Sequence, residues 1–301
     1  MTPVPGATLL TCGDPLRPGR PDPHFAGAAR AAGELGAGVA LVDHDALVAG
    51  RADEAVARVE RGTGPLWYRG WMLPAERYAQ LARALAGRGR TLVTDAAQYR
   101  TAHELPGWYG TLAEATPASV WLPTEPGVVP PVERLAELAA RLPPGAVVVK
   151  DYVKSRKHEW DEACFVPDAA DHARLSRVVG RFVELQEEFL AGGIVLRAFE
   201  DFTGEERRVW WVDGEPVLTT AHPDADATTA PDPGGRPLPA PDLARVAPLV
   251  RALGCPFVTT DMALRTDGAW RVVEVGDGQV SGLPADVEEA RLLEHLLGDR
   301  G

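Results

Sequence analysis

Lysine is the scarcest charged residue of this sequence. Only three of the 31 basic side chains are lysines, and all three, Lys150, Lys154 and Lys157, fall within eight residues of one another. A general preference for arginine accounts for the low number but not for the clustering. Lysine is a compact point charge on a flexible stem, whereas arginine is a rigid planar fork. The cluster therefore predicts a site that grips phosphate through point charges, and a solvated basic loop is the alternative.

Other absences exclude whole classes of protein. The three cysteines, Cys12, Cys164 and Cys255, are odd in number and far apart, which argues against a disulfide framework and a cysteine-rich zinc site. No apolar run reaches 18 residues, and the N-terminus MTPVPGATLL has no basic leader. We therefore expect a cytoplasmic protein that does not contact a membrane.

Positive charge is also in deficit. The formal net charge is −12 and basic residues form no broad run, so a nucleic-acid partner is not expected. The first predicted strand, ATLLTC, is not followed by Gly-x-Gly-x-x-Gly, so the dinucleotide-binding fingerprint is absent.

The chain of 301 residues is long enough for two domains. Residues 7–122, through the run SVWLP, alternate strand-like and helix-like segments, which is typical of a mostly parallel sheet. Pro143-Pro144-Gly145 marks a break, and hairpin signals dominate after it. A helix is predicted from about 171 to 190, with an apolar stripe. The prediction is an α/β (α+β) chain.

The last predicted hairpin, TTDMALRTDGAWRVVEVGDG, carries carboxylates in both strands. If Asp267-Gly268 is a two-residue turn, Thr266 pairs with Ala269 and Asp261 lies opposite Glu274. Two such charges at about 4 Å repel by roughly 4 kcal/mol at an effective dielectric constant near 20. A divalent cation between the two carboxylates, Mg²⁺ or Mn²⁺, would turn this repulsion into attraction. Two alternatives are a register off by one and an arginine partner for Asp261.

Further candidates stand at the ends of predicted elements. Lys150 ends a buried-looking strand, and Arg197 and Arg208 lie on later strands; as alternatives, Lys150 is a solvated strand end and Arg197 pairs with a surface acid. His222 begins a predicted loop to residue 239, and with Asp224 and Asp226 it imitates a metal site, although a solvated loop is favoured. The aromatic group Trp67, Tyr68 and Trp71 is expected in the core or at an interface, with a substrate-facing wall as the alternative.

Cations on one side and carboxylates on the other fit a nucleoside triphosphate with its metal ion. At this point the sequence resembles the ATP-grasp superfamily, and within it the clade named for two arginines and one lysine. The resemblance is carried by VVVKDYVKS (147–155), GGIVLRAFEDF (192–202), EERRVWWVDGEPV (205–217) and TDMALRTDGAWRVVEVGDGQVSGLP (260–284).

The resemblance implies an ATP-grasp fold with an N-terminal Rossmann-like pre-ATP-grasp domain over 1–122. The ATP-grasp domain would be 123–301, with ATP between subdomains of about 146–200 and 201–301. It also implies a ligase that uses ATP and Mg²⁺ (or Mn²⁺), activates a small-molecule or peptide carboxylate as an acylphosphate and joins it to an amine, releasing ADP. A homodimer is compatible with it. A phosphotransferase and a nucleotide-binding regulatory protein without turnover are the alternative functions.

The resemblance further assigns roles to residues. Catalysis would fall to Arg197, Arg208 and Lys150, and the metal ligands would be Asp261 and Glu274. Nucleotide-binding residues would be Lys150, Lys154, Ser155, Lys157, Ala198, Phe199, Glu200 and Asp201. Many relatives have an asparagine two residues after the final glutamate, where this chain has Gly276, so Asp277 is the substitute expected as third ligand. The Gly-rich phosphate loop of many relatives is also missing. Residues 154–160 are expected to do its work as a loop that is mobile without ATP and closes over the phosphates.

Overall fold

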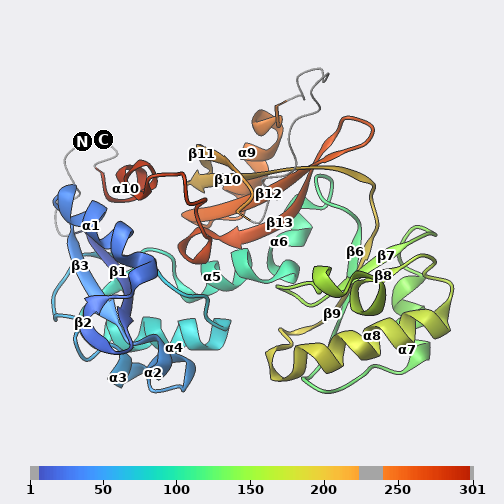
Figure 1. Ribbon diagram of the computed structural model, residues 1–301, viewed down its shortest axis with the longest axis horizontal. Helices are drawn as coiled ribbons and strands as arrows, with labels where there is room; N and C mark the ends of the chain where they lie inside the picture. Colours follow the sequence, from blue (N-terminus) through green and yellow to red (C-terminus); the bar gives the residue numbers. More distant parts are fainter. Residues whose placement is uncertain (1–6, 224–239, 299–301) are drawn as a thin grey trace. The chain divides into compact units, whose positions relative to one another are not determined.

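The computed structural model describes residues 7–223 and 240–298. Within these residues the chain forms three β-sheets with helices packed against them (Figure 1). It divides into two compact units, each assembled from separate stretches of sequence. The first unit combines Met1–Ala102, Glu206–Met262 and Val275–Gly301, and the second combines His103–Glu205 and Ala263–Glu274. The boundary expected at residue 122 and the expected subdomain limits stay predictions.

The N-terminal sheet is parallel, as the alternation of elements predicts. Its strands are β1 (Thr8–Asp14), β3 (Gly38–Val42), β4 (Pro65–Arg69) and β5 (Thr91–Leu92), in the order β3-β1-β4-β5, and β2 (Arg17–Pro21) pairs antiparallel with β1. The helices of this half of the chain are α1 (Ala26–Glu34), α2 (His44–Val48), α3 (Ala52–Ala55), α4 (Ala75–Ala86), α5 (Ala96–His103) and α6 (Leu105–Leu112).

Side chains of β1 alternate between two cores because successive residues of a strand point to opposite faces. Leu9 packs in a core with Ala28 of α1 and Leu293 of α10 (Glu289–Leu297). Leu10 packs in another core with Tyr78 and other residues of α4. A parallel sheet covered on both faces explains the nearly continuous apolar run at this strand.

The second sheet lies in the second unit. Its strands are β6 (Ser119–Pro123), β7 (Val147–Lys150), β8 (Phe165–Val166) and β9 (Gly193–Ala198), in the order β6-β9-β7-β8, and each pair is antiparallel. The run SVWLP was expected to belong to the parallel sheet, which is wrong, because β6 pairs with β9 instead. The sequence of such a short strand does not predict which sheet the strand joins.

Helices α7 (Val132–Ala139) and α8 (His172–Gln186) cover one face of this sheet (Figure 1). The Asp171 side chain accepts a hydrogen bond from the Arg174 backbone N–H and so caps the start of α8. The predicted apolar stripe of this helix is confirmed at five of its six positions, which are buried: Leu175, Val178, Val179, Phe182 and Val183. The sixth, Leu185, is only partly buried.

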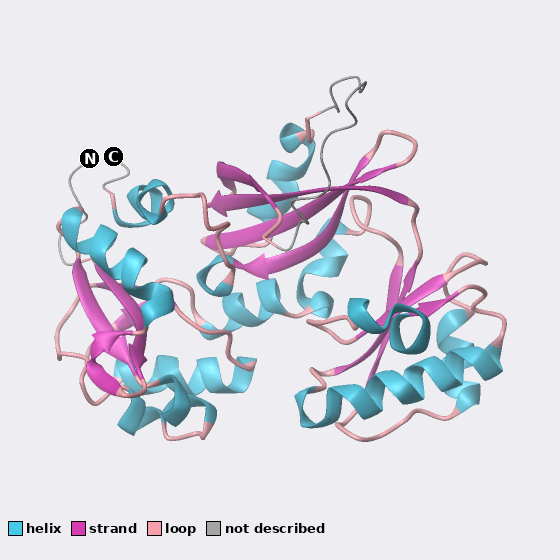
Figure 2. Cartoon of the chain, viewed as in Figure 1, coloured by secondary structure: helices cyan, strands magenta, loops and turns pink. Residues whose placement is uncertain are grey.

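The third sheet has the order β11-β10-β12-β13, from β10 (Phe202–Val212), β11 (Glu215–Ala221), β12 (Phe257–Arg265) and β13 (Trp270–Asp277), and α9 (Leu243–Ala252) precedes β12 (Figure 2). Asp213 and Gly214 have φ angles of +51° and +79° and join β10 to β11, so the predicted hairpin is confirmed. Among the helices of the described ranges, none is both long enough and apolar enough to cross a membrane.

The turn between β12 and β13 differs from the prediction. The Arg265 backbone N–H donates to the Ala269 carbonyl at 2.8 Å, and the Gly268 N–H donates to the Arg265 carbonyl at 2.8 Å. Arg265, not Thr266, therefore pairs with Ala269, and the loop has three residues. Gly268 has a φ of +88°, the left-handed conformation that a three-residue hairpin loop requires at this position.

The pairing of Asp261 with Glu274 no longer follows from the turn. Counting back from Arg265 and Ala269 places Val273, not Glu274, opposite Asp261. Along β13, however, Val272 and Val275 are both buried, so the alternation of faces breaks between them. A cation shared by Asp261 and Glu274 stays a prediction.

Candidate functional site

Two buried cations lie on neighbouring strands of the second unit. Lys150 ends β7 and Arg197 lies on β9, which pair antiparallel, and their side chains are 5% and 8% exposed. Burial lowers the pKa of Lys150 to about 8, against the opposing effect of the Glu274 carboxylate. Burial likewise lowers the pKa of Arg197 to about 10, again opposed first by Glu274. Two buried cations thus lie side by side, an arrangement that suits an anion.

The Arg197 guanidinium is held on two sides. Its Nε donates to Ser119 Oγ at 3.1 Å, its Nη1 donates to the Val273 carbonyl, and its Cζ lies 5.9 Å from the Trp108 ring centroid. Its Nη2 is buried and has no hydrogen-bond partner among the residues that the structure describes. A buried donor without an acceptor costs free energy, so this nitrogen is suited to a ligand oxygen.

The residues expected at the adenine and ribose adjoin an aromatic group. Phe199, which follows Ala198 at the end of β9, is 40% exposed and packs edge-on against Phe165 at 5.2 Å between ring centroids. Trp160 stacks on Phe165 at 5.1 Å. The three rings thus lie together, and Trp160 and Phe199 are partly exposed to solvent.

The two acids after Phe199 are placed differently. Glu200 is engaged by Arg271 at 3.0 Å and 3.1 Å and by Arg265 at 3.3 Å. Asp201 is exposed, and its backbone carbonyl accepts from the Thr266 N–H. Asp201 therefore offers the more accessible carboxylate to a ribose.

The loop that carries the lysines starts from a buried acid. Asp151 accepts hydrogen bonds from the Val153 and Lys154 backbone N–H groups and, through its other oxygen, from Gln186 Nε2 at 2.7 Å. Lys154 and Lys157 are exposed, and Ser155 is half-buried in a bridge with Lys150.

Downstream in the same loop, Arg156 pairs with Glu159 at 3.2 Å. Within the loop, an acid thus holds one of the three cations, and Lys154 and Lys157 have no ion pair among the described residues.

A second cluster lies in the first unit, on β10 and β12. Arg208 Nε donates to Asp261 Oδ1 at 2.7 Å, and Arg208 Nη2 donates to Asp261 Oδ2 at 2.8 Å. Burial raises the pKa of Asp261, but Arg208 and His222 outweigh it and the net pKa is lowered. The sequence alternative that gives Asp261 an arginine partner is therefore confirmed in this structure.

His222, just after β11, joins this cluster. Its Nε2 lies 3.0 Å from Arg208 Nη2 and 3.4 Å from Asp261 Oδ2. Glu206, His222 and Asp261 each offer one ligand atom, and these atoms lie within 4.8 Å of one another. The sequence suggested that His222, Asp224 and Asp226 resemble a metal site. Asp224 and Asp226 lie outside the described residues. The sequence did not predict Glu206 as a metal ligand, although its position two residues before Arg208 puts both on one face of a strand.

Asp277 has a different environment from the other acids. It is fully buried, and its Oδ1 accepts from the backbone N–H and the Nε2 of Gln279, each at 2.9 Å. Its Oδ2 has no hydrogen-bond partner among the described residues. Burial raises the pKa of Asp277 to about 7. Asp277 is thus enclosed by protein atoms, and its role as third metal ligand stays a prediction.

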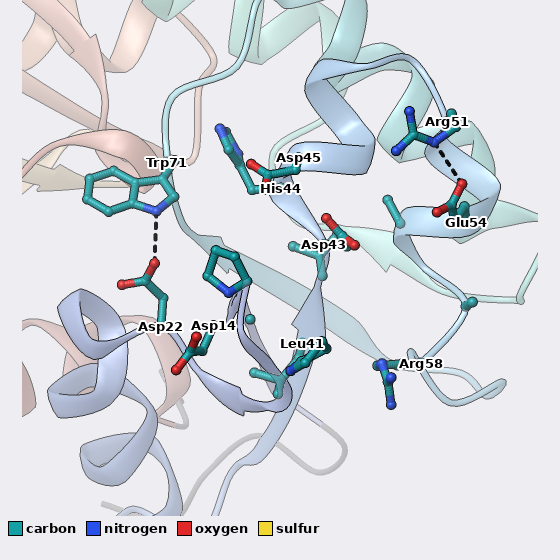
Figure 3. Close-up of a pocket in the computed structure, with 16 residues that line it drawn as sticks. Asp14, Asp22, Leu41, Asp43, His44, Asp45, Arg51, Glu54, Arg58 and Trp71 are labelled. Carbon is teal, nitrogen blue, oxygen red and sulfur yellow. Dashed lines mark hydrogen bonds and ion pairs between the residues drawn. The ribbon is translucent and has the colours of Figure 1, made fainter.

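The first unit also contains an open pocket of about 370 Å³ (Figure 3). It lies at the carboxyl ends of β1, β3 and β4, where the chain order places β3 and β4 on opposite sides of β1. Ligands of open α/β sheets bind at such points. Trp71, 39% exposed, lines the pocket, whereas Trp67 and Tyr68 are in the core. The wall alternative thus fits Trp71 alone of the three.

Carboxylates outnumber cations around this pocket. Two of the five acids are occupied, since Asp14 pairs with Arg17 at 2.9 Å and Glu54 with Arg51 at 2.8 Å. The other three have no ion pair with any residue in the described ranges: Asp22, Asp43 and Asp45. Asp22 lies beside Trp71, whose Nε1 is 3.4 Å from Asp22 Oδ2 (Figure 3).

Comparisons with known proteins identify the family and the fold of the chain. The chain belongs to the ATP-grasp superfamily, because residues 134–296 match the model of an ATP-grasp domain, family 3 of the clade named for two arginines and one lysine. The clade and the ATP-grasp fold predicted from the sequence are confirmed. The comparison with curated proteins found no match.

Three solved structures illustrate the similarity of fold. A RimK domain ATP-grasp protein from Sphaerobacter thermophilus is 18% identical with a TM-score of 0.55, and the match covers 91% of this chain and 92% of that one. The D-cycloserine synthetase DcsG is 18% identical with a TM-score of 0.60, covering 96% and 98%. The D-alanine–D-alanine ligase from Bacillus anthracis, complexed with ATP, is 15% identical with a TM-score of 0.53, covering 96% and 94%.

Proposed function

We propose that this protein is an ATP- and Mg²⁺-dependent ligase that activates a carboxylate as an acylphosphate and joins it to an amine, releasing ADP. The observation that carries the proposal is the pair of buried cations on neighbouring strands, Lys150 and Arg197, with Arg197 Nη2 buried and without a hydrogen-bond partner among the described residues. Burying unbalanced positive charge is costly, and a polyphosphate offsets that cost when it binds. Membership of the ATP-grasp superfamily and similarity to an ATP-bound ligase support the nucleotide.

The chain's own residues divide the work. Lys150 and Arg197 neutralise phosphate oxygens, and Arg197 Nη2 donates to one of them. Lys154, Ser155 and Lys157 add contacts from the loop, Ala198 and Phe199 support the base, and Asp201, with Glu200 behind it, faces the ribose. Asp261 and Glu274 would hold the cation, which would supply positive charge to offset the charge that develops on the phosphates. Carboxylate oxygens suit Mg²⁺.

The pocket in the N-terminal sheet receives the acceptor in this proposal. Three carboxylates without ion pairs and one exposed indole favour a ligand with a cationic end, since carboxylates attract it and the ring face of tryptophan binds cations. The reacting amine must be deprotonated to attack, so the cationic end is a second group of the acceptor.

Product analysis tests the reaction. The protein is incubated with ATP, Mg²⁺ and a panel of amino acids, short peptides and diamines, and ADP, AMP and phosphate are quantified. We expect ADP and phosphate to be released in equal amounts, and hydroxylamine to trap the activated carboxylate as a hydroxamate. AMP release would exclude phosphoryl activation. ADP release without hydroxamate or condensed product would indicate a phosphotransferase, and nucleotide binding without turnover would indicate a regulatory protein.

A further inference from the structure

The side chains of Glu206, His222 and Asp261 converge on one face of the third sheet, beside Arg208. Glu206 and Arg208 lie on β10, Asp261 lies on β12, and His222 follows β11. Arg208 pairs with Thr220 and Arg207 with Ala221, so the next position in this register brings Glu206 opposite His222. The ligand atoms of Glu206, His222 and Asp261 lie within 4.8 Å of one another, a separation that one coordinated cation spans.

The contacts of His222 Nε2 make opposite demands on its proton. Arginine carries only donors, so Nε2 needs a lone pair to accept from Arg208 Nη2 at 3.0 Å. A hydrogen bond to Asp261 Oδ2, 3.4 Å away, needs a proton on the same nitrogen. One nitrogen cannot meet both demands. A cation at the place of the guanidinium satisfies the lone pairs of Nε2 and Oδ2 together.

A second observation concerns Gly276, the position at which many relatives have an asparagine. Position 276 is a glycine, and a Cβ there would lie 2.9 Å from Thr259 Oγ1 and 3.3 Å from Ser281 Oγ. Thr259 and Ser281 are themselves hydrogen-bonded at 2.8 Å, so the space for a longer side chain is filled. Asp277 is enclosed as described above. Position 276 therefore offers no ligand, and a third protein ligand would come from another strand.

We propose that His222 is a direct ligand of the divalent cation at Asp261, with Glu206 beside it, and that this imidazole replaces the ligand that Gly276 does not provide. The inference rests on the proposed nucleotide-dependent function. Arg208 pairs with Asp261 in this structure and would leave it when the metal binds. An imidazole among carboxylates favours Mn²⁺ over Mg²⁺, because magnesium prefers oxygen ligands alone.

Pulsed electron paramagnetic resonance of bound Mn²⁺ tests the ligand directly. The full-length protein is loaded with Mn²⁺ and β,γ-methylene-ATP, a non-hydrolysable analogue without a bridging nitrogen. We expect electron spin echo modulation from a directly coordinated ¹⁴N. In protein grown with ¹⁵N-histidine the signal must change to that of ¹⁵N, which separates an imidazole from a nitrogen of adenine. An oxygen-only spectrum in the wild-type protein would overturn the inference without any variant.

Variants then assign the signal. His222→Asn should abolish the nitrogen modulation and weaken Mn²⁺ binding roughly tenfold, by analogy with the loss seen when supporting groups of metal sites are removed. His172→Asn, at the exposed start of α8, is the matched control and should keep both. Circular dichroism confirms that each variant is folded. Unchanged modulation in His222→Asn would assign the nitrogen to another histidine and overturn the proposal.

The outcomes separate this inference from the proposed function. If wild-type protein binds no Mn²⁺-nucleotide complex in equilibrium dialysis, the proposed function fails and the ligand assignment fails with it. If the complex binds tightly through oxygen ligands alone, the proposed function stands and only the role of His222 is refuted.

Discussion

Arg208 and Asp261 form a two-pronged ion pair across β10 and β12, with Nε to Oδ1 at 2.7 Å and Nη2 to Oδ2 at 2.8 Å. Both side chains are largely buried. The carboxylate assigned to the metal ion is thus already neutralised by one of the two arginines expected from the name of the clade. Metal binding at Asp261 competes with this pair.

Arg208→Gln should expose that competition. Removing one partner of a buried pair costs about 3 to 5 kcal/mol of stability, and Mn²⁺ should restore part of it by taking the place of the guanidinium. The measurement is the melting temperature with and without Mn²⁺, in the absence of nucleotide. The Mn²⁺-induced rise should be larger than in wild type. Arg251→Gln, which breaks an exposed pair with Glu215, is the control and should leave the rise unchanged.

Lys150 couples stability to pH and to nucleotide. Its pKa is about 8 in the folded protein and 10.5 unfolded, so between these values the unfolded chain binds more protons and wild-type stability rises with pH. Lys150→Met should be more stable than wild type at pH 7, by at most about 3 kcal/mol, and the difference should vanish as pH rises through this window. Urea unfolding at pH 7 and pH 10 measures it.

The same position decides nucleotide affinity. Lys150→Ala should weaken ATP binding more than Lys150→Arg, because the charge survives in the second variant. Isothermal titration with the ATP analogue compares them, and equal affinity of both variants and wild type contradicts the assignment of Lys150 to the phosphates.

Asp277 should make the stability of the protein depend on pH in the opposite direction from Lys150. Its pKa is about 7 in the folded protein and 3.8 unfolded, so the native state holds a proton that the unfolded chain has lost. Stability therefore falls as pH rises from 3.8 to 7, and Asp277→Asn should be more stable than wild type at pH 8 by roughly 2 to 4 kcal/mol. Asp267→Asn is a control of opposite sign, since Arg265 lowers the pKa of this exposed acid to about 2. A loss of Mn²⁺ affinity in Asp277→Asn would restore Asp277 as a metal ligand.

The loop from Lys154 to Trp160 should respond to nucleotide. Lys154 and Lys157 are exposed, and triphosphate gives them a common partner in a site where charge-assisted contacts are strong. Trypsin should cut after Lys154, Arg156 and Lys157 more slowly with ATP and Mg²⁺. Cleavage elsewhere in the chain is the internal control. Equal rates in both conditions would mean that the Arg156–Glu159 pair already fixes the loop.

The acceptor pocket makes a prediction about kinetics. Asp43→Asn with Asp45→Asn should raise the KM for a cationic acceptor about tenfold or more and leave the KM for ATP unchanged, because each charge-assisted contact contributes about 1.5–3 kcal/mol as a general magnitude. Glu54→Gln, whose carboxylate is already paired with Arg51, is the matched control. An equal change in the KM for ATP would place these acids outside acceptor binding.

Local patterns predicted much of the fold. The stripe of α8 and the strand that delivers Lys150 followed from periodicity, because each depends on residues close in sequence. The turn at Asp267-Gly268 was wrong by one residue, since a glycine with positive φ serves a two-residue loop and a three-residue loop equally well. The sequence could not decide between a cation and an arginine as the partner of Asp261, for a different reason. Arg208 is 53 residues away, and only the order of strands in the sheet brings them together.

Arg69, at the end of β4, donates to the carbonyls of Gly278 and Ser281 at 2.9 Å and 2.7 Å, and Arg208 Nη1 lies 3.3 Å from the carbonyl of the next residue, Gly282. Trp71 of the acceptor pocket is two residues from Arg69. One short backbone segment therefore contacts both Arg69, two residues before Trp71 of the pocket, and Arg208, which pairs with Asp261. Any coupling between the two sites through this segment is reciprocal. A bound acceptor changes the affinity for the metal-nucleotide complex by some factor, and the metal-nucleotide complex must change the affinity for the acceptor by the same factor. Two titrations in opposite order then form a closed thermodynamic cycle, and the size of that factor measures how far this segment imposes an order of substrate addition.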